Sequence, residues 1–219
     1  MKASYLAGKK LADFIEVTSP AWSLAEAVDF RLSPAPMGLQ PTQAIRAQWK
    51  DRQYGLIDHV RISAVHNGEH LGVRMQWDCP EESLNITDND VFTDAAAIML
   101  PCVPGAPLLL MGNEKAPVNA CYWRANVGQK GINIIARGIG TSQSVAQGSV
   151  VCRQLRRDGK WLLVITRPLL VEGLHPQAQL RPGDKTPFGV AIWAGANQER
   201  AGIKSVGISS EDLFLERIE

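Results

Sequence analysis

Three histidines lie close together in the sequence and could in principle bind a metal. They are His59, His66 and His70. The dipeptide Asn67-Gly68 separates the last two, so their rings could approach each other diagonally across a hairpin. Because His66 and His70 have no third ligand with clear spacing, we interpret all three histidines as solvated hairpin side chains.

Carboxylates cluster in "NITDNDVFTD", where Asp88, Asp90 and Asp94 could form an acid–base pair. Asp and Asn at such short spacing more often build turns, so a loop is the favoured interpretation. The chain has no G-x-S-x-G, H-E-x-x-H or P-loop motif, and hydrolase or nucleotide-binding functions have no support.

Two further segments carry a methionine and a lysine in unusual places. The apolar run "PLLLM" ends at Met111, and Gly112 and a polar loop follow. In "FGVAIWAGANQERAGIKSVGI" a predicted strand ends at Trp193 and a Gly/Asn loop leads to Lys204. Taken singly, Met111 is most simply a core residue at a strand end, and Lys204 a solvated lysine.

The composition is that of a soluble globular protein. The 219 residues are 45 % hydrophobic and 21 % charged, with a formal net charge of +1. Such a charge gives no field that would steer a polyanion, so we expect no nucleic-acid partner. We also expect no membrane span, because no apolar stretch approaches the roughly 20 residues that one needs. The N-terminus shows neither a Sec-type h-region nor a twin-arginine pair.

The four cysteines are scattered at Cys79, Cys102, Cys121 and Cys152. They form no C-x-x-C pair for zinc or redox chemistry and no C-x-x-C-H for covalent haem. Free thiols are the favoured interpretation, and one or two disulfides stay open.

Alternating apolar residues predict two β-hairpins. In the first, Val60, Ile62 and Ala64 are followed by Asn67-Gly68, which suits a type I′ turn, and then by Leu71, Val73, Met75 and Trp77. In the second, Asp158-Gly159 makes the turn, and Trp161, Leu163 and Ile165 share a face.

Many short strands punctuated by 19 Gly and 13 Pro indicate a mainly β fold, an antiparallel β-sandwich with a few short helices in loops. Helical periodicity is best in the first dozen residues. We expect one domain over residues 1–219. The other predicted strands are Ser23–Leu32, Asp94–Leu100, Ala106–Met111, Ile132–Ala136, Phe188–Trp193 and Leu213–Ile218.

Three stretches together resemble a known family. They are "VFTDAAAIMLP", "MGNEKAPVNACYWRA" and "VAIWAGANQERAGIKSV". Their order and spacing are similar to the haem b-binding γ subunit of the type II dimethyl-sulfoxide-reductase-family molybdoenzymes. That group includes ethylbenzene dehydrogenase, dimethylsulfide dehydrogenase, selenate reductase and chlorate reductase. The pattern looks nearest to the hydrocarbon-oxidising branch.

The resemblance implies a non-catalytic electron-transfer subunit with a non-covalent haem b. Its iron would be held by Met111 and Lys204, the methionine of "MG" and the lysine of "ER.G.KS". The haem would relay electrons between the iron–sulfur β subunit of an αβγ complex, whose α subunit carries the molybdenum cofactor, and a soluble cytochrome or similar partner. It also implies work in the periplasm after export with a signal-bearing partner; a cytoplasmic complex is the alternative.

A second function hypothesis belongs to another class. β-Sandwiches also serve as carbohydrate-binding modules without a cofactor, and aromatic side chains stack on sugars. Trp49, Trp123 and Trp193 are the candidate platforms for that function.

Overall fold

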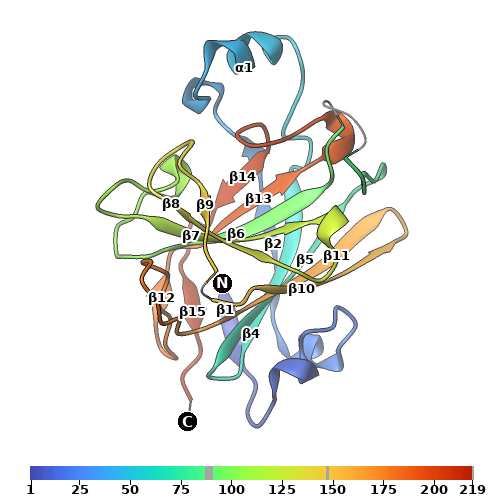
Figure 1. Ribbon diagram of the computed structural model, residues 1–219. Coiled ribbons are helices and arrows are strands. Elements are labelled where there is room, and N and C mark those ends of the chain that lie inside the picture. The colour runs from blue at the N-terminus through green and yellow to red at the C-terminus, as the bar shows by residue number, and fades with distance from the viewer. Residues whose placement is uncertain (87–90, 147, 219) are drawn as a thin grey trace.

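The computed structural model describes residues 1–86, 91–146 and 148–218. The strands of these residues form one sheet of eight strands and one of seven. The two sheets pack face to face over a shared apolar core (Figure 1). The predicted mainly β sandwich is confirmed.

The eight-stranded sheet, sheet A, is mixed. The N-terminal strand β1 lies between β4 and β15 and pairs in parallel with both, whereas the other pairs are antiparallel. In order of pairing the strands are β10 (Val151–Arg157), β11 (Lys160–Pro168), β5 (His70–Asp78), β4 (His59–His66), β1 (Lys2–Tyr5), β15 (Leu213–Leu215) and β12 (Lys185–Thr186), and β2 (Ala27–Arg31) also pairs with β4.

The seven-stranded sheet, sheet B, is antiparallel throughout. Its strands in order are β3 (Ser33–Pro34), β14 (Ser205–Ile208), β13 (Gly189–Trp193), β6 (Ala95–Pro101), β7 (Val118–Arg124), β8 (Ile132–Ala136) and β9 (Gln143–Ser144). The strands β6 and β7 are the longest of this sheet, and their inner side chains pack, with those of β13, against sheet A.

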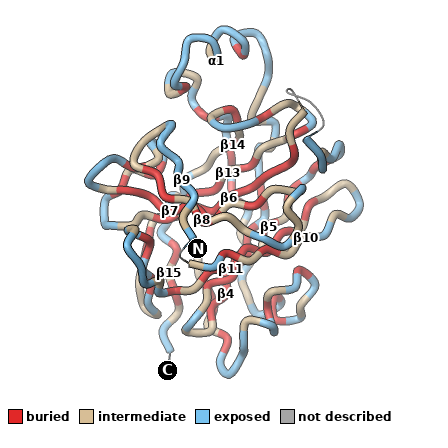
Figure 2. The backbone as a smooth tube through the Cα atoms, viewed as in Figure 1, coloured by how far each residue is buried: buried red, intermediate tan, exposed pale blue. Residues whose placement is uncertain are grey.

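The core lies between the sheets, as Figure 2 shows by the buried backbone along the strands. Three tryptophans meet there edge to face, with the Trp123 ring centroid 6.2 Å from that of Trp77 and 5.1 Å from that of Trp161. Rings packed in this way add to the stabilisation that burial alone provides.

Both predicted hairpins are present. All the alternating apolar residues assigned to their inner faces are in the core. Asp158 and Gly159 have φ angles of 51° and 71°, as a type I′ turn requires. The type I′ prediction for Asn67-Gly68 is wrong, because only Gly68 has positive φ and the loop between the strands is three residues long. The Asn67 side chain instead accepts hydrogen bonds from the Glu69 and His70 amides.

The predicted strand Ala106–Met111 is wrong. Its centre is a 3₁₀ helix, η4 (Leu108–Leu110). The chain closes on itself here, since the Gly112 and Met111 amides donate to the carbonyls of Pro107 and Leu108. A strand would instead have paired with a neighbour. Of the other predicted strands, Ile132–Ala136 is matched in full. Phe188–Trp193 differs from β13 by one residue at its start, and Asp94–Leu100 differs from β6 by one residue at each end. Ser23–Leu32 and Leu213–Ile218 shorten to β2 and β15.

Helices are few and short in the described residues. The α-helix α1 (Gln43–Gln48) stands away from the sandwich at the top of Figure 1 and was not predicted. It has no buried face that would create an apolar period, and the Thr42 hydroxyl caps it. The first dozen residues are not helical beyond one turn, since they contain β1 and the 3₁₀ helix η1 (Leu11–Asp13). The remaining 3₁₀ helices are η2 (Pro20–Leu24), η3 (Met37–Leu39), η5 (Ala125–Val127) and η6 (Gly195–Asn197).

Two of the three histidines differ from the prediction of solvated side chains. His59 is exposed beside Asp58, but His66 is fully buried and His70 is partly buried. Among the described residues, neither ring nitrogen of His66 and not the buried Nδ1 of His70 has a hydrogen-bond partner. Burial lowers the pKa of His66, so its ring is neutral at pH 7. Within the described residues, no three His, Cys, Asp or Glu side chains gather as a metal site.

Two other expectations concern membrane-spanning helices and the state of the cysteines. Across the described ranges, no helix has the length and apolar character that a membrane crossing requires. All four cysteines are unpaired, and burial raises the pKa of the Cys79 thiol to about 12 and that of Cys102 to about 11. Asp88 and Asp90 lie outside the described residues.

Candidate functional site

The outer face of sheet B carries a cleft of about 420 Å³. Strand alternation creates it: on β6, Ile98 and Leu100 point into the core, so Ala97 and Met99 face outward. A cleft of this size lies within the range typical of small-molecule sites. It is lined by residues 35, 36, 39–41, 97, 99, 108, 109, 111, 120, 122, 134, 139, 140, 142, 190, 191, 193, 201, 202, 204, 206 and 208.

The floor of the cleft is apolar and consists largely of short side chains. Ala97 pairs with Ala191 of β13, and Ala120 of β7 lies opposite Met99. Alanines at the centre of a sheet leave space above it that larger side chains would fill. The floor therefore suits a flat, apolar ligand.

Three segments form the walls. One is residues 35–41, which lead from β3 towards α1 (Figure 1). The second is the loop 139–142, and the third is η4 with Met111. On the side of β14, Gly202 and Lys204 complete the rim.

Met111 caps η4 in the left-handed conformation, with φ 59° and ψ 33°. Gly138 fixes it from the next loop by donating its amide hydrogen to the Met111 carbonyl at 2.9 Å. Gly112 follows with φ +81°, and a Cβ there would lie 2.9 Å from the carbonyl oxygens of Ala116 and Ala136. The "MG" dipeptide is thus a tight reversal that only glycine permits at its second position, and it carries Met111 to the wall of the cleft.

Lys204 belongs to the last of the three matched sequence stretches, but its side chain lines the same cleft as Met111. Its Nζ is 4.9 Å from the ring centroid of Trp193, whose ring packs edge to face on Tyr122 at 5.4 Å. In the described part of the chain, the amine has no hydrogen bond and no ion pair. Burial without an anion lowers the pKa of Lys204 from 10.5 to about 8.

Glu199 holds the loop that leads to Lys204. This carboxylate is 1 % exposed and accepts hydrogen bonds from the amides of Ala194, Gly55 and Leu56 and from the side chain of Asn197, at 2.8–3.3 Å. It thereby ties the turn after β13 to the segment that returns from α1. Asn197 and Glu199 of the matched stretch therefore anchor this loop structurally.

Gly202 gives the same loop its close approach to residue 40. A Cβ at Gly202 would lie 2.0 Å from Oε1 of Gln40, whose Nε2 donates to the Gly202 carbonyl at 2.9 Å. The wall formed by residues 35–41 is in this way attached beside Lys204.

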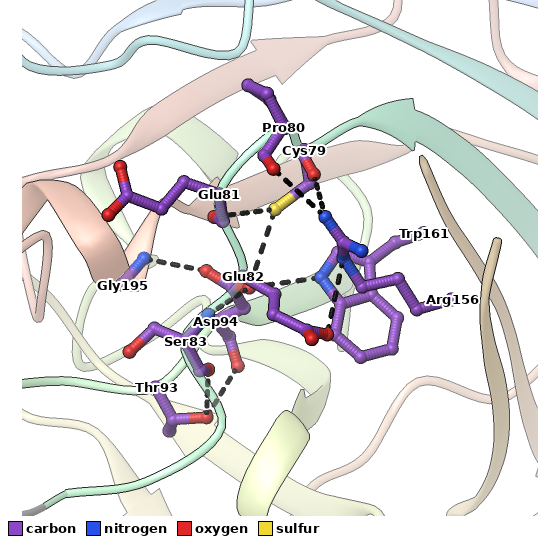
Figure 3. A network of polar contacts seen from close by, with 10 residues as sticks. All are labelled: Cys79, Pro80, Glu81, Glu82, Ser83, Thr93, Asp94, Arg156, Trp161 and Gly195. Atoms are coloured by element: carbon purple, nitrogen blue, oxygen red, sulfur yellow. Dashed lines mark hydrogen bonds and ion pairs between the residues drawn. The ribbon is translucent and has the colours of Figure 1, made fainter. Parts of the chain in front are cut away.

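A second buried carboxylate, Asp94, joins this loop to both sheets (Figure 3). Its oxygens accept from the amides of Gly195 and Ser83 and from the Trp161 indole, at 2.8–3.0 Å. The Cys79 thiol completes the set at 3.5 Å. Asp94 precedes β6 outside any regular element, as the loop interpretation predicted, but it is buried and structural.

The structure brings the two predicted site residues together. Met111 and Lys204 are 93 positions apart in the sequence and line one cleft. Met99 is a second thioether on the same cleft, and the sequence reasoning missed it. The alternation of β6 could have revealed it, since Met99 stands two residues after the outward-facing Ala97.

The aromatic platforms proposed for a carbohydrate site are mostly covered. Trp123 is fully buried in the core and Trp49 is 5 % exposed, so neither offers a free ring face. Trp193 is partly exposed and lines the cleft beside Lys204. One of the three candidate platforms is therefore placed to meet a ligand.

A thioether and an amine whose pKa is lowered to about 8, both on an apolar cleft, are suited to a transition metal held in a hydrophobic cofactor. The sequence model of the family described as ethylbenzene dehydrogenase matches residues 19–154, more than half of the chain. The chain belongs to the ethylbenzene dehydrogenase family. This confirms the resemblance found from the sequence. The match includes Met111, and Lys204 lies beyond it.

Curated relatives agree with the family. A protein of Haloferax mediterranei described as a respiratory nitrate reductase heme subunit is 31 % identical over 190 residues, covering 86 % of this chain and 64 % of the relative. Chlorate reductase subunit gamma of Ideonella dechloratans is 36 % identical, covering 65 % and 59 %. Dimethylsulfide dehydrogenase subunit gamma of Rhodovulum sulfidophilum is 28 % identical, covering 68 % and 57 %. The chain spans about three fifths of the length of these relatives.

Solved structures show the same fold in other proteins. A family 9 carbohydrate-binding module of Caldicellulosiruptor kristjanssonii, in complex with glucose, superposes with a TM-score of 0.53 at 9 % identity, covering 100 % of this chain and 96 % of that one. A carbohydrate-binding protein of Bacteroides uniformis gives 0.50 at 9 % identity, covering 98 % and 99 %. At this identity the likeness is one of fold alone.

Replacing Glu199 by alanine should destabilise the protein by about 3 kcal/mol, because buried amide donors lose their acceptor. Urea unfolding followed by tryptophan fluorescence measures the change. Glu69→Ala, at an exposed hairpin position, is the control and should stay within about 0.5 kcal/mol of wild type. Equal effects of the two substitutions would contradict the anchoring role.

Lys204→Met should stabilise the ligand-free protein by about 1–3 kcal/mol at pH 7, because the folded state no longer holds a desolvated ammonium. Between pH 8 and 10.5 the folded wild type has lost this proton while the unfolded chain still binds it, so wild-type stability rises with pH. The advantage of the variant should therefore shrink towards pH 10. Urea unfolding of both proteins at pH 7 and pH 10 measures it, and a difference independent of pH would contradict a lowered pKa.

Proposed function

We propose that this chain is an electron-transfer subunit that carries a non-covalent haem b, whose iron would be held by Met111 and Lys204. The observation that supports this most directly is the meeting of the two side chains on one apolar cleft. A second support is the name of the Haloferax mediterranei relative, a heme subunit.

The donors fit the group. The Met111 thioether is a soft ligand that favours ferrous iron and raises a reduction potential. Lysine binds iron only as a neutral amine, and the burial that lowers the pKa of Lys204 to about 8 makes that form accessible near neutral pH. The alanine floor and apolar walls match the body of a tetrapyrrole.

The residues that would hold the haem favour electron transfer as its function. When bound, the haem supplies a one-electron couple. With Met111 and Lys204 both holding its iron, the haem would serve electron transfer rather than oxygen chemistry. The apolar floor and walls keep water away from the ligands. Because neither side chain handles a substrate, the chain itself is not an enzyme.

The proposal extends to the partners of this chain. We propose that the chain joins an iron–sulfur β subunit and a catalytic α subunit with the molybdenum cofactor, and exchanges electrons with a soluble cytochrome or similar carrier. Two relatives are gamma subunits of a chlorate reductase and a dimethylsulfide dehydrogenase. Oxidation of a hydrocarbon by the complex is the proposed chemistry.

The proposed setting is the periplasm, reached as a folded passenger on a partner that carries a signal. Residues 1–219 would act there as one domain. Support for this comes from the core, to which both sheets contribute. Fractionation of the native host for the haem-containing complex tests the location.

An optical spectrum tests the ligand pair. The purified full chain, reconstituted with haemin and reduced with dithionite, should show sharp α and β bands of a low-spin b-type haem. Met111→Ala and Lys204→Ala should each abolish these bands, because one axial position is then empty.

Two control variants remove the same functional groups, a thioether and an amine, at nearby positions. Met99→Ala removes the second thioether of the cleft, and Lys115→Ala removes an exposed lysine near Met111. Both should retain the bands. A folded wild-type chain that takes up no haemin, or loss of the bands in Met99→Ala but not in Met111→Ala, would overturn the assignment.

A further inference from the structure

Arg124 is a cation that lacks a partner. It is the last residue of β7 and is partly buried. Its Nε is inaccessible to solvent and has no hydrogen-bond partner, and within the described ranges the guanidinium forms no ion pair. A buried guanidinium nitrogen without an acceptor is costly and requires an explanation, and a bound anion is one that would satisfy it.

Arg124 lies on the cleft side of sheet B. Trp123 points into the core, so Tyr122 and Arg124 both face outward, about 7 Å apart along the strand. Tyr122 lines the cleft itself. Opposite Arg124 on β6 stands Ala95, a small side chain that leaves the guanidinium room over the sheet.

The Tyr122 hydroxyl is a second unused donor. In the described part of the chain, no side chain or backbone group exchanges a hydrogen bond with it. The ring is fixed by the edge-to-face contact with Trp193 at 5.4 Å. Burial raises the pKa of the Tyr122 phenol, an effect that nearby Arg124 partly opposes. The hydroxyl is therefore protonated at neutral pH and available to donate.

The charges around the cleft favour an anion. No Asp or Glu is among the lining residues that the structure describes, so the charge of Arg124 meets no carboxylate of the cleft. A guanidinium presents paired N–H donors that match a carboxylate, and a phenol adds a third donor. An apolar floor with such donors at one end fits a flat, apolar molecule that carries carboxylates on one edge.

We propose that Arg124 and the Tyr122 hydroxyl form a carboxylate-binding subsite at the Trp193 end of the cleft. This inference rests on the proposed function, and the ligand carboxylates are then the acidic side chains of the porphyrin. Arg124 orients the ring by its carboxylate edge, while Met111 and Lys204 act on the iron.

Haemin and haemin dimethyl ester test the subsite, because they differ only in the free carboxylates. Arg124→Gln should weaken the binding of haemin to the full chain about tenfold, since a charge-assisted contact is lost. It should leave the affinity for the dimethyl ester unchanged. Tyr122→Phe should show the same selectivity with a smaller loss. Titration followed at the Soret band measures both affinities.

The control is Arg157→Gln, at the exposed turn of the second hairpin, which should alter neither affinity. Binding of the ester also shows that each variant has folded with an intact cleft. An equal loss for haemin and ester in Arg124→Gln, or no loss for either, would overturn the subsite. Failure of the proposed function is distinguishable, because the wild type would then bind neither compound.

Discussion

Lys204 has its amine in an apolar cleft with no anion beside it, and the surrounding loop has to hold it there at a cost in stability. Left free, a lysine side chain would turn to solvent. The contact with Trp193 and the anchor at Glu199 restrain this one. The desolvation that disfavours the ammonium also prepares a neutral amine that can bind a metal. Under the proposed ligation of iron, stability and function therefore oppose each other at this residue.

The sandwich provides the support for this arrangement. Its inner faces form a conventional core, which frees the outer face of sheet B for a binding site. Two buried carboxylates, Asp94 and Glu199, each accept hydrogen bonds both from the turn around η6 and from distant segments, and so link them. At the wall of the cleft formed by η4, the tight chain reversal at Gly112 fixes the position of Met111. The same fold in carbohydrate-binding proteins shows that the site, and not the sandwich, sets this chain apart.

The sequence was informative where local chemistry decides the structure. Alternation gave the inner faces of both hairpins, and Asp158-Gly159 gave a true type I′ turn. It misled at Ala106–Met111, because an apolar run does not reveal that its backbone closes on itself instead of pairing. Partners distant in sequence were also hidden, such as the parallel neighbours of β1 and the fourfold acceptance by Glu199. Met111 and Lys204 were found through the family pattern, since each side chain alone is ordinary.

The account depends on the claim that these two side chains hold one iron. Anomalous scattering at the iron edge, from crystals of the haem-loaded chain, tests it most directly. We predict a single iron peak inside the cleft, bonded to Sδ of Met111 on one side and Nζ of Lys204 on the other. An iron peak bonded to Met99 or a histidine, or lying outside the cleft, would contradict the account.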